Sequence, residues 1–240
     1  MHPYIHIGTL VFDSYTVFNN LGTLLGLFAM YLILSVKSKK TSLCWMMIAF
    51  TLAVMFIGAV PAHYLKDLFG GAGPGATHFL GRVLVYALLL PLFLRAVCRG
   101  GEGSVCAWNS AAAYIMIQHF FNRTACTMRG CCGGRFIPAL KMSFPTRGFE
   151  ALSMLAGLMW LMRSMRSGKN RNCFYTVCLW FSAVIFISEF FMDQPDIGRV
   201  LHLTSVQYGA LLLAVYSASA NFFLRRRSRD ESGPDAHHVT

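Results

Sequence analysis

Charged residues are scarce in this chain of 240 residues, where they make up 13 % of the sequence, with 21 Lys and Arg and only 10 Asp and Glu. A soluble domain usually carries about a quarter of charged residues, so this set is too small to cover a water-exposed surface. Proline and charge are also too rare for a disordered chain. Apolar residues make up 55 % of the sequence and the mean hydropathy is +0.52. The composition therefore indicates a polytopic membrane protein.

The few charges are mostly basic, which gives a formal net charge of +11. In a soluble chain such a charge would suggest binding to nucleic acid. Here the Lys and Arg residues form short clusters between apolar segments, and no basic stripe is interleaved with aromatic residues. This placement is typical of a membrane topology signal. We therefore expect a membrane environment and no nucleic-acid partner.

Seven apolar segments follow one another, at residues 14–36, 43–62, 79–97, 105–121, 149–166, 173–192 and 203–224. Four of them are long enough to cross a hydrocarbon core of roughly 30 Å as helices, and three are shorter or carry polar residues. The sequence predicts an all-α membrane protein, a bundle of seven transmembrane helices over residues 1–224, with a basic, disordered cytoplasmic tail at 225–240. Because most Lys and Arg then lie in the inner loops, the N-terminus is placed outside and the C-terminus in the cytoplasm.

Polar side chains gather at the outer ends of the predicted helices. His78 and Arg82 are four residues apart and lie on one helical face. The whole group comprises Tyr15, His78, Arg82, Gln118, His119, Asn122, Arg147, Glu150, Glu189, Asp193 and Gln207. One interpretation is that helix ends are polar because they meet lipid headgroups. The other, which we favour, is a cationic site in the outer leaflet, because ionisable groups at membrane depth usually face a cavity and Arg can hold a phosphate through two hydrogen bonds.

Three of the eight cysteines, Cys126, Cys131 and Cys132, lie in the predicted outer loop 122–148. On an oxidising side of the membrane, Cys126 could form a disulfide with Cys131 or Cys132. Neighbouring arginines would also lower the pKa of a thiol, so a reactive thiolate is the alternative. A zinc site would need a fitting histidine pattern, which the loop lacks. We therefore expect no metal and no cofactor.

Several stretches around this loop match a known pattern. Arg123, Gly130 and Gly134 have the spacing of the Arg and two later Gly residues in G-R-x-G-N-F-x-N-G-E-x-x-G. Three further stretches and the N-terminal segment match in the same order: Phe144–Ala151 with H-P-[ST]-Q-L-Y-E-A, Ser188–Asp196 with R-F-x-x-E-F-F-R-x-P-D, Leu203–Tyr208 with L-T-x-x-Q, and Ile7-Gly8 followed by Ser14-Tyr15. The chain therefore resembles the prolipoprotein diacylglyceryl transferase family, a seven-helix fold of the bacterial inner membrane.

The chain departs from the family pattern at functional positions. Cys126 and Cys131 stand at the Asn and Glu positions of the loop, and Arg129 stands at a second Asn. The H-G-G-x-x-G loop of the family is reduced to His78-Phe79-Leu80-Gly81, and Ile185 and Met192 replace two Arg residues. The chain is most similar to a divergent branch with a Gly-Cys-Cys-x-Gly loop.

The resemblance implies a phospholipid-dependent transferase that serves lipoprotein maturation. Such an enzyme moves a diacylglyceryl group from phosphatidylglycerol to the thiol of a lipobox cysteine in a protein substrate and releases glycerol phosphate. The site would lie at the outer leaflet of the inner membrane. Two alternatives stay open: a transferase of the same fold with another donor or acceptor, and a lipid-binding paralogue without catalysis.

The resemblance and the polar helix ends together give the expected roles. Arg123 would hold the leaving phosphate, and His78 or His119 would take the thiol proton. The expected catalytic residues are Arg123, His78, His119, Cys131 and Glu150, with Cys131 as a transient nucleophile if the acceptor differs. The expected substrate-binding residues are Tyr15, Arg82, Arg129, Gly130, Gly134, Arg147, Glu189 and Gln207.

Overall fold

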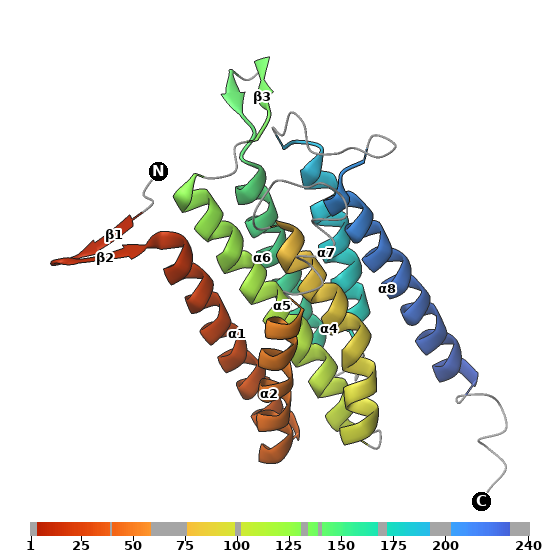
Figure 1. Cartoon of the computed structure of the whole chain (residues 1–240). Helices are drawn as coiled ribbons and strands as arrows, with labels where there is room; N and C mark the ends of the chain where they lie inside the picture. Colours follow the sequence, from red (N-terminus) through yellow and green to blue (C-terminus); the bar gives the residue numbers. More distant parts are fainter. Residues whose placement is uncertain are drawn as a thin grey trace, which may run out of the picture.

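The computed structural model describes residues 4–38, 40–58, 76–98, 102–130, 134–138, 141–167, 172–192 and 203–230. Most of these residues lie in seven helices: α1 (Ser14–Ser38), α2 (Thr41–Ile57), α4 (Ala76–Val97), α5 (Glu102–Arg129), α6 (Thr146–Arg166), α7 (Phe174–Glu189) and α8 (Ser205–Asp230). The helices run alongside one another as a bundle (Figure 1). This architecture confirms the predicted all-α class.

Two short antiparallel hairpins, which the sequence analysis did not predict, extend from the bundle. The first pairs β1 (Tyr4–Ile7) with β2 (Leu10–Asp13) and leads directly into α1. The second pairs β3 (Phe136–Ile137) with β4 (Met142–Ser143) between α5 and α6, and it projects beyond the ends of the helices (Figure 1). Both hairpins lie at the same end of the bundle as the starts of α1 and α6.

The predicted segments agree with the helices except at some ends. α5 runs to Arg129, well past the predicted end at 121. The predicted outer loop 122–148 is therefore wrong in its first part, because Asn122, Arg123 and Cys126 are helical. α8 likewise continues to Asp230, past the predicted end at 224. Residues 59–75 and 231–240, which include most of the connection between the second and third predicted segments and the end of the predicted tail, lie outside the described residues.

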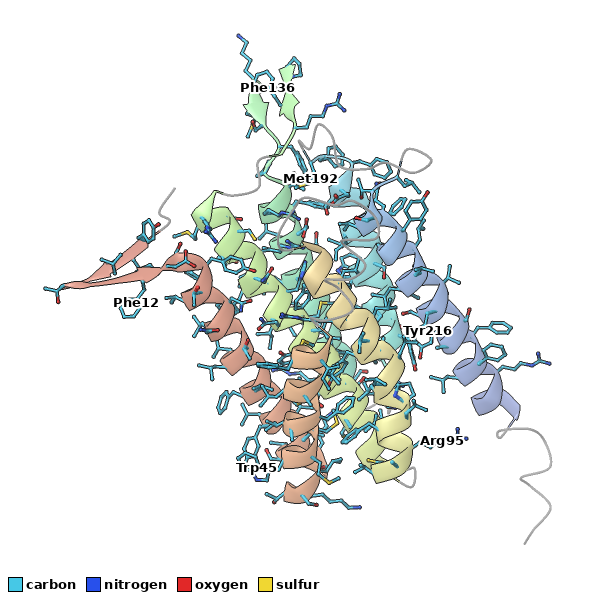
Figure 2. The ribbon with its side chains drawn as sticks, in the orientation of Figure 1. Phe12, Trp45, Arg95, Phe136, Met192 and Tyr216 are labelled. Atoms are coloured by element: carbon cyan, nitrogen blue, oxygen red, sulfur yellow. The ribbon has the colours of Figure 1, made fainter. Side chains whose placement is uncertain are left out.

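The exterior of the bundle is rich in apolar side chains. Two helices, α1 and α4 from Phe79 to Val97, are long and apolar enough to cross a membrane, and α2 and α7 are apolar but shorter. Exposed large apolar residues surround the helices (Figure 2) and include Leu24, Phe28, Trp45, Phe56, Leu92, Leu152, Leu212 and Phe223. Length and composition thus make α1 and α4 the candidate membrane spans among the described helices.

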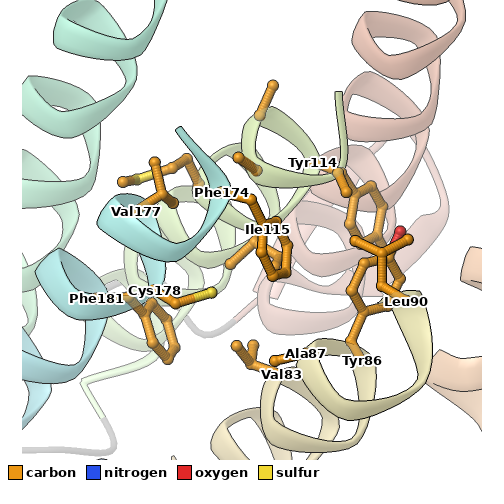
Figure 3. Packing of buried hydrophobic residues seen from close by; sticks show 14 of the residues in the cluster. Val83, Tyr86, Ala87, Leu90, Tyr114, Ile115, Phe174, Val177, Cys178 and Phe181 are labelled. Atoms are coloured by element: carbon orange, nitrogen blue, oxygen red, sulfur yellow. The ribbon is translucent and has the colours of Figure 1, made fainter. Parts of the chain in front are cut away.

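The centre of the bundle is closely packed by α4, α5 and α7. Tyr86 and Leu90 of α4, Ile115 of α5 and Phe174 and Phe181 of α7 are fully buried (Figure 3). The few polar side chains at this level include two that contact each other. The Thr51 hydroxyl of α2 lies 2.9 Å from the Tyr86 hydroxyl. The middle of the bundle is therefore an apolar core and holds no ionic site in the part that the structure describes.

Helix α1 lies unusually close to α5. A Cβ atom at Gly22 would lie 2.6 Å from Cβ of Phe121, and one at Gly26 would lie 2.8 Å from Cδ2 of Tyr114. Small residues four apart allow this kind of approach between helices. The close packing brings the polar side chains in the first turns of α1 against the last turns of α5.

Candidate functional site

The polar helix ends meet at one end of the bundle. α5 and α7 finish there, and α1, α6 and α8 begin there (Figure 1). Arg123 is six residues from the end of α5, and Glu150 is the fifth residue of α6. At a rise of about 1.5 Å per residue, both side chains start within roughly 9 Å of the bundle end.

A buried ionic group surrounds Glu150, and we call it the Glu150 cluster: His119, Arg123, Arg147, Glu150 and Ser188. The Oε1 atom of Glu150 lies 2.6 Å from Nη1 of Arg147 and accepts a hydrogen bond from the Ser188 hydroxyl at 2.8 Å. Its Oε2 atom pairs with Nε of Arg123 and lies 3.4 Å from Nε2 of His119. The cluster thus joins α5, α6 and α7 through one carboxylate.

Helical spacing explains why these residues converge. His119 and Arg123 are four apart on α5, and Arg147 and Glu150 are three apart on α6, so each pair shares one face of its helix. Glu150 is 0 % exposed and Arg123 is 1 % exposed. Burying a charge is costly unless it is paired. Two guanidinium groups therefore depend on the same carboxylate.

Arg123 makes its contacts through one edge of the guanidinium group. Its Nε donates to Nε2 of His119 at 3.1 Å and pairs with Glu150. Among the residues that the structure describes, no hydrogen bond or ion pair reaches its two terminal nitrogens. The side chain is thus oriented at Nε, and its Nη edge is left for a further anion, which a guanidinium can hold through two parallel hydrogen bonds.

His119 is enclosed by aromatic rings. Its ring centroid lies 5.0 Å from that of Phe79 and 4.8 Å from that of Phe181, and the residue is fully buried. Since Nε2 accepts a hydrogen from Arg123, this nitrogen cannot take another proton while that contact holds. In this arrangement His119 orients Arg123.

The neighbouring face of α5 carries a second polar group, which we call the amide cluster: Tyr15, Asn19, Gln118 and Asn122. The Asn122 amide donates to the Tyr15 hydroxyl and to Oδ1 of Asn19, both at 3.0 Å. The Gln118 amide donates to the same Oδ1 at 3.1 Å. The amide cluster contains no charge and joins α1 to α5.

Glu189 and Gln207, both predicted to bind substrate, lie where α7 ends and α8 begins. Glu189 accepts a hydrogen bond from the Thr204 hydroxyl at 3.4 Å. Gln207 accepts one from the Thr204 backbone N–H at 2.9 Å, while its own N–H donates to the Thr204 hydroxyl at 3.2 Å. This reciprocal pair is a capping box, so the Gln207 side chain has a structural role at the start of α8.

The predicted loop glycines also have structural roles. Gly130 ends α5 with φ of 69°, a left-handed conformation that favours glycine after a helix. Gly134 forms a β-bridge with Met192, and a Cβ atom there would collide with the Phe144 carbonyl oxygen. Arg129 is exposed and lies over the Tyr15 ring, 6.0 Å from its centroid. These residues shape the end of the bundle beside the Glu150 cluster.

Of the remaining predicted residues, the structure describes the side chain of Arg82 alone. Arg82 lies half-buried on α4, and its buried Nε has no hydrogen-bond partner in the described part of the chain. His78 belongs to α4, but its side chain lies outside the described residues, as does Cys131. The disulfide predicted from Cys126 to Cys131 or Cys132 also falls partly outside them and stays a prediction. Within the described ranges, no group of His, Cys, Asp and Glu could hold a metal ion.

The sequence analysis missed three residues that complete these contacts: Asn19, Ser188 and Thr204. Asn19 lies in the predicted apolar segment 14–36, and a polar residue in such a segment indicates a contact with another polar group. Ser188 adjoins Glu189 in a stretch that was already singled out. The spacing from Thr204 to Gln207 is that of a capping box and was read only as a family motif.

Neither the known family models nor the sequences of curated proteins match this chain. The resemblance to the diacylglyceryl transferase family therefore rests on the short sequence motifs described above alone.

Proposed function

We propose that this protein is a membrane-embedded, phospholipid-dependent transferase that moves a diacylglyceryl group from phosphatidylglycerol to a cysteine thiol of a protein substrate. Three observations support the proposal: the ordered motif resemblance, the apolar exterior of the bundle, and the buried arginines at one end. The observation that carries most weight is the orientation of Arg123, whose Nε edge is held by Glu150 and His119 while its terminal edge is available.

The same proposal includes the membrane arrangement. All seven described helices would cross the inner membrane, with the N-terminus outside, the C-terminus in the cytoplasm and the Glu150 cluster at the outer leaflet. The positive-inside placement of Lys and Arg supports this orientation. The apolar side chains around the helices support contact with lipid.

The reaction needs a cation at the leaving group and a base for the thiol. The acceptor sulfur forms a bond to the glyceryl carbon, the bond from that carbon to the phosphate oxygen breaks, and glycerol phosphate leaves with the electron pair. The terminal nitrogens of Arg123 would stabilise the charge that develops on the phosphate. Arg147 would add to the positive potential, because it shares the Glu150 carboxylate with Arg123.

The contacts of His119 suggest different roles for the two predicted histidines. His119 orients Arg123 through Nε2 and is enclosed by Phe79 and Phe181, so we assign it a positioning role. His78 is then the candidate base for the thiol proton, since imidazole titrates near neutral pH. Cys131 would act as a transient nucleophile only with another acceptor.

A second candidate is a lipid-binding protein of the same architecture without catalysis. It is favoured by Met192, which is buried in a bridge to Gly134 at a position where the family has an arginine. The two candidates differ in turnover: both would bind phosphatidylglycerol, but only the transferase would release glycerol phosphate.

Rescue of a bacterial strain depleted of its own diacylglyceryl transferase tests the function directly. We expect the parent chain to restore growth and lipidated lipoproteins, and the Arg123→Ala variant to be inserted at the same level without restoring either. Binding of phosphatidylglycerol by the purified parent protein, without rescue and without release of glycerol phosphate, would support the second candidate. Rescue by Arg123→Ala would refute the assigned site.

A further inference from the structure

Helix α4 carries an arginine on its buried face. Arg82 lies three residues after Phe79 and four before Tyr86, so the three side chains share one side of the helix, and both aromatic residues are buried. The ring of Phe79 lies 5.0 Å from that of His119, whereas the Tyr86 hydroxyl reaches Thr51 in the apolar core. Arg82 therefore lies between the Glu150 cluster and the core, about 4.5 Å deeper in the bundle than Phe79.

Two neighbouring helices surround the Arg82 side chain. A Cβ atom at Gly58, where α2 ends, would lie 3.1 Å from Cα and 3.2 Å from Cγ of Arg82, so the aliphatic stem packs closely against α2. The guanidinium group is close enough to the buried Tyr114 of α5 for an electrostatic interaction. Tyr114 and His119 are five residues apart, about 140° around α5. The head of Arg82 thus meets a different face of α5 from the one that carries His119 and Arg123.

Arg82 has no anionic partner in the part of the chain that the structure describes. Its Nε atom is buried and makes no hydrogen bond there, and the ion pairs of this part all involve Glu150. An arginine can extend its head to water along its stem, but here α2 packs against the stem and Nε is enclosed. A buried charge is costly unless it is paired, and at membrane depth it usually marks a ligand site.

We propose that Arg82 and the Tyr114 hydroxyl form a second phosphate-binding position, separate from Arg123 and deeper in the bundle. A guanidinium group can hold two phosphate oxygens through parallel hydrogen bonds, and a phenol hydroxyl can donate a third. The phosphate belongs to an anionic phospholipid or to a free phosphate ion, and the test separates these two sources. The proposal goes beyond the proposed function, because no step of the transfer uses Arg82.

Counting bound lipids tests this position. The parent, Arg82→Met, Arg82→Lys and the control Arg95→Met are purified in detergent with phosphatidylglycerol, and native mass spectrometry measures the lipid retained per chain. Arg95 is exposed on the same helix, so its substitution is a matched loss of charge. We expect Arg82→Met to retain one phosphatidylglycerol fewer than Arg95→Met, because binding at that position becomes about 10–100-fold weaker. Arg82→Lys should be intermediate, since it keeps the charge without the fork.

Thermal unfolding separates binding from a structural role. Arg82→Met keeps an unbranched stem against Gly58 and removes an unpaired charge, so its melting temperature without lipid should equal or exceed that of the parent. Phosphatidylglycerol should raise the melting temperature of the parent more than that of the variant. Dioleoylglycerol, which has acyl chains but no phosphate, should not distinguish the two proteins.

Inorganic phosphate identifies the source of the ligand. If it displaces the lipid that depends on Arg82, or stabilises the parent but not Arg82→Met, the position takes free phosphate; if it does neither, the phosphate is that of the lipid.

Three results would overturn the proposal: equal lipid retention by Arg82→Met and Arg95→Met, a lower lipid-free melting temperature or failure to fold in Arg82→Met, and discrimination between parent and variant by dioleoylglycerol. Arg123→Ala reports separately on the proposed function. If it retains as much lipid as the parent while Arg82→Met does not, the assigned site at Arg123 fails and the position at Arg82 stands.

Discussion

Helix α5 presents two polar faces at the same depth, and their chemistry is different. Gln118 and Asn122 meet α1 through neutral amides, whereas Arg123, which contacts His119, meets Glu150 of α6 through an ion pair. Consecutive residues differ by about 100° around a helix. Two pairs that are offset by one residue in the sequence therefore build two separate interfaces.

The two interfaces differ in what they contribute. In the amide cluster the donors of α5 converge on Asn19, as expected of a contact that holds two packed helices together. In the Glu150 cluster the desolvation of buried charges offsets much of their attraction. A buried ionic contact is thus a poor way to gain stability, and this is why we propose a functional role for the oriented Arg123. The following substitutions test whether the two faces of α5 contribute differently to stability and to transfer activity.

Loss of the shared carboxylate should have the largest effect. Glu150→Gln removes the ion-pair partner of Arg123 and one ion-pair partner of Arg147 inside a buried cluster, so we expect a loss of about 3–5 kcal/mol in unfolding free energy. Thermal unfolding of the purified parent and variant proteins in detergent measures this loss of stability. Asp13→Asn is the control, because Asp13 is outside the cluster and at the protein surface. A Glu150→Gln protein as stable as this control would contradict the assigned ion pairs.

Substitution of Arg123 should affect activity far more than stability. In Arg123→Ala the Glu150 carboxylate keeps Arg147, so unfolding should change less than in Glu150→Gln, while transfer should fall by about 10²–10³-fold or more. Arg123→Lys should rescue poorly, because an ammonium group cannot reproduce the bidentate fork. Transfer rates and melting temperatures measured on the same preparations check both statements. Near-parental transfer by Arg123→Lys would argue against phosphate binding at this edge.

Substitution in the amide cluster should have the smallest effect. Asn19→Ala removes the acceptor for Gln118 and Asn122, which should cost about 0.6–2 kcal/mol of stability and leave transfer measurable. The variant is compared with the parent by thermal unfolding and by transfer rate. If Asn19→Ala stays folded but transfers no lipid, the amide face also serves the reaction and the comparison between the faces fails.

The sequence was sufficient for the helical class, for most helix positions and for the gathering of polar residues at one end. It failed at the end of α5, because the polarity of Asn122 and Arg123 suggested a loop. A hydropathy pattern contains the polarity of a residue but not its partner, and here Asn19 and Glu150 supply the partners from distant segments. The two hairpins were missed because their strands are only four and two residues long.

The candidate site could also be predicted only in part from the sequence. Arg123, His119, Arg147 and Glu150 were all singled out by their polarity at membrane depth, and they do converge. Which neighbouring helix each face of α5 meets, and which nitrogen of Arg123 is held, depends on helix packing that no local pattern contains. For Gln207 the local pattern was sufficient. The spacing from Thr204 to Gln207 is that of a capping box, and the two residues form one, so the match to the family motif does not by itself indicate substrate binding.

The most direct test is a transfer assay on two neighbouring variants, Arg123→Ala and Asn122→Ala, which lie on the two faces of α5. Each is reconstituted with acyl-labelled phosphatidylglycerol and a lipobox peptide, and labelled peptide and released glycerol phosphate are measured. We predict that the parent and Asn122→Ala form both products and that Arg123→Ala forms at least about 100-fold less of each while still folded. Equal loss in both variants, or near-parental product formation by Arg123→Ala, would contradict a phosphate site at Arg123.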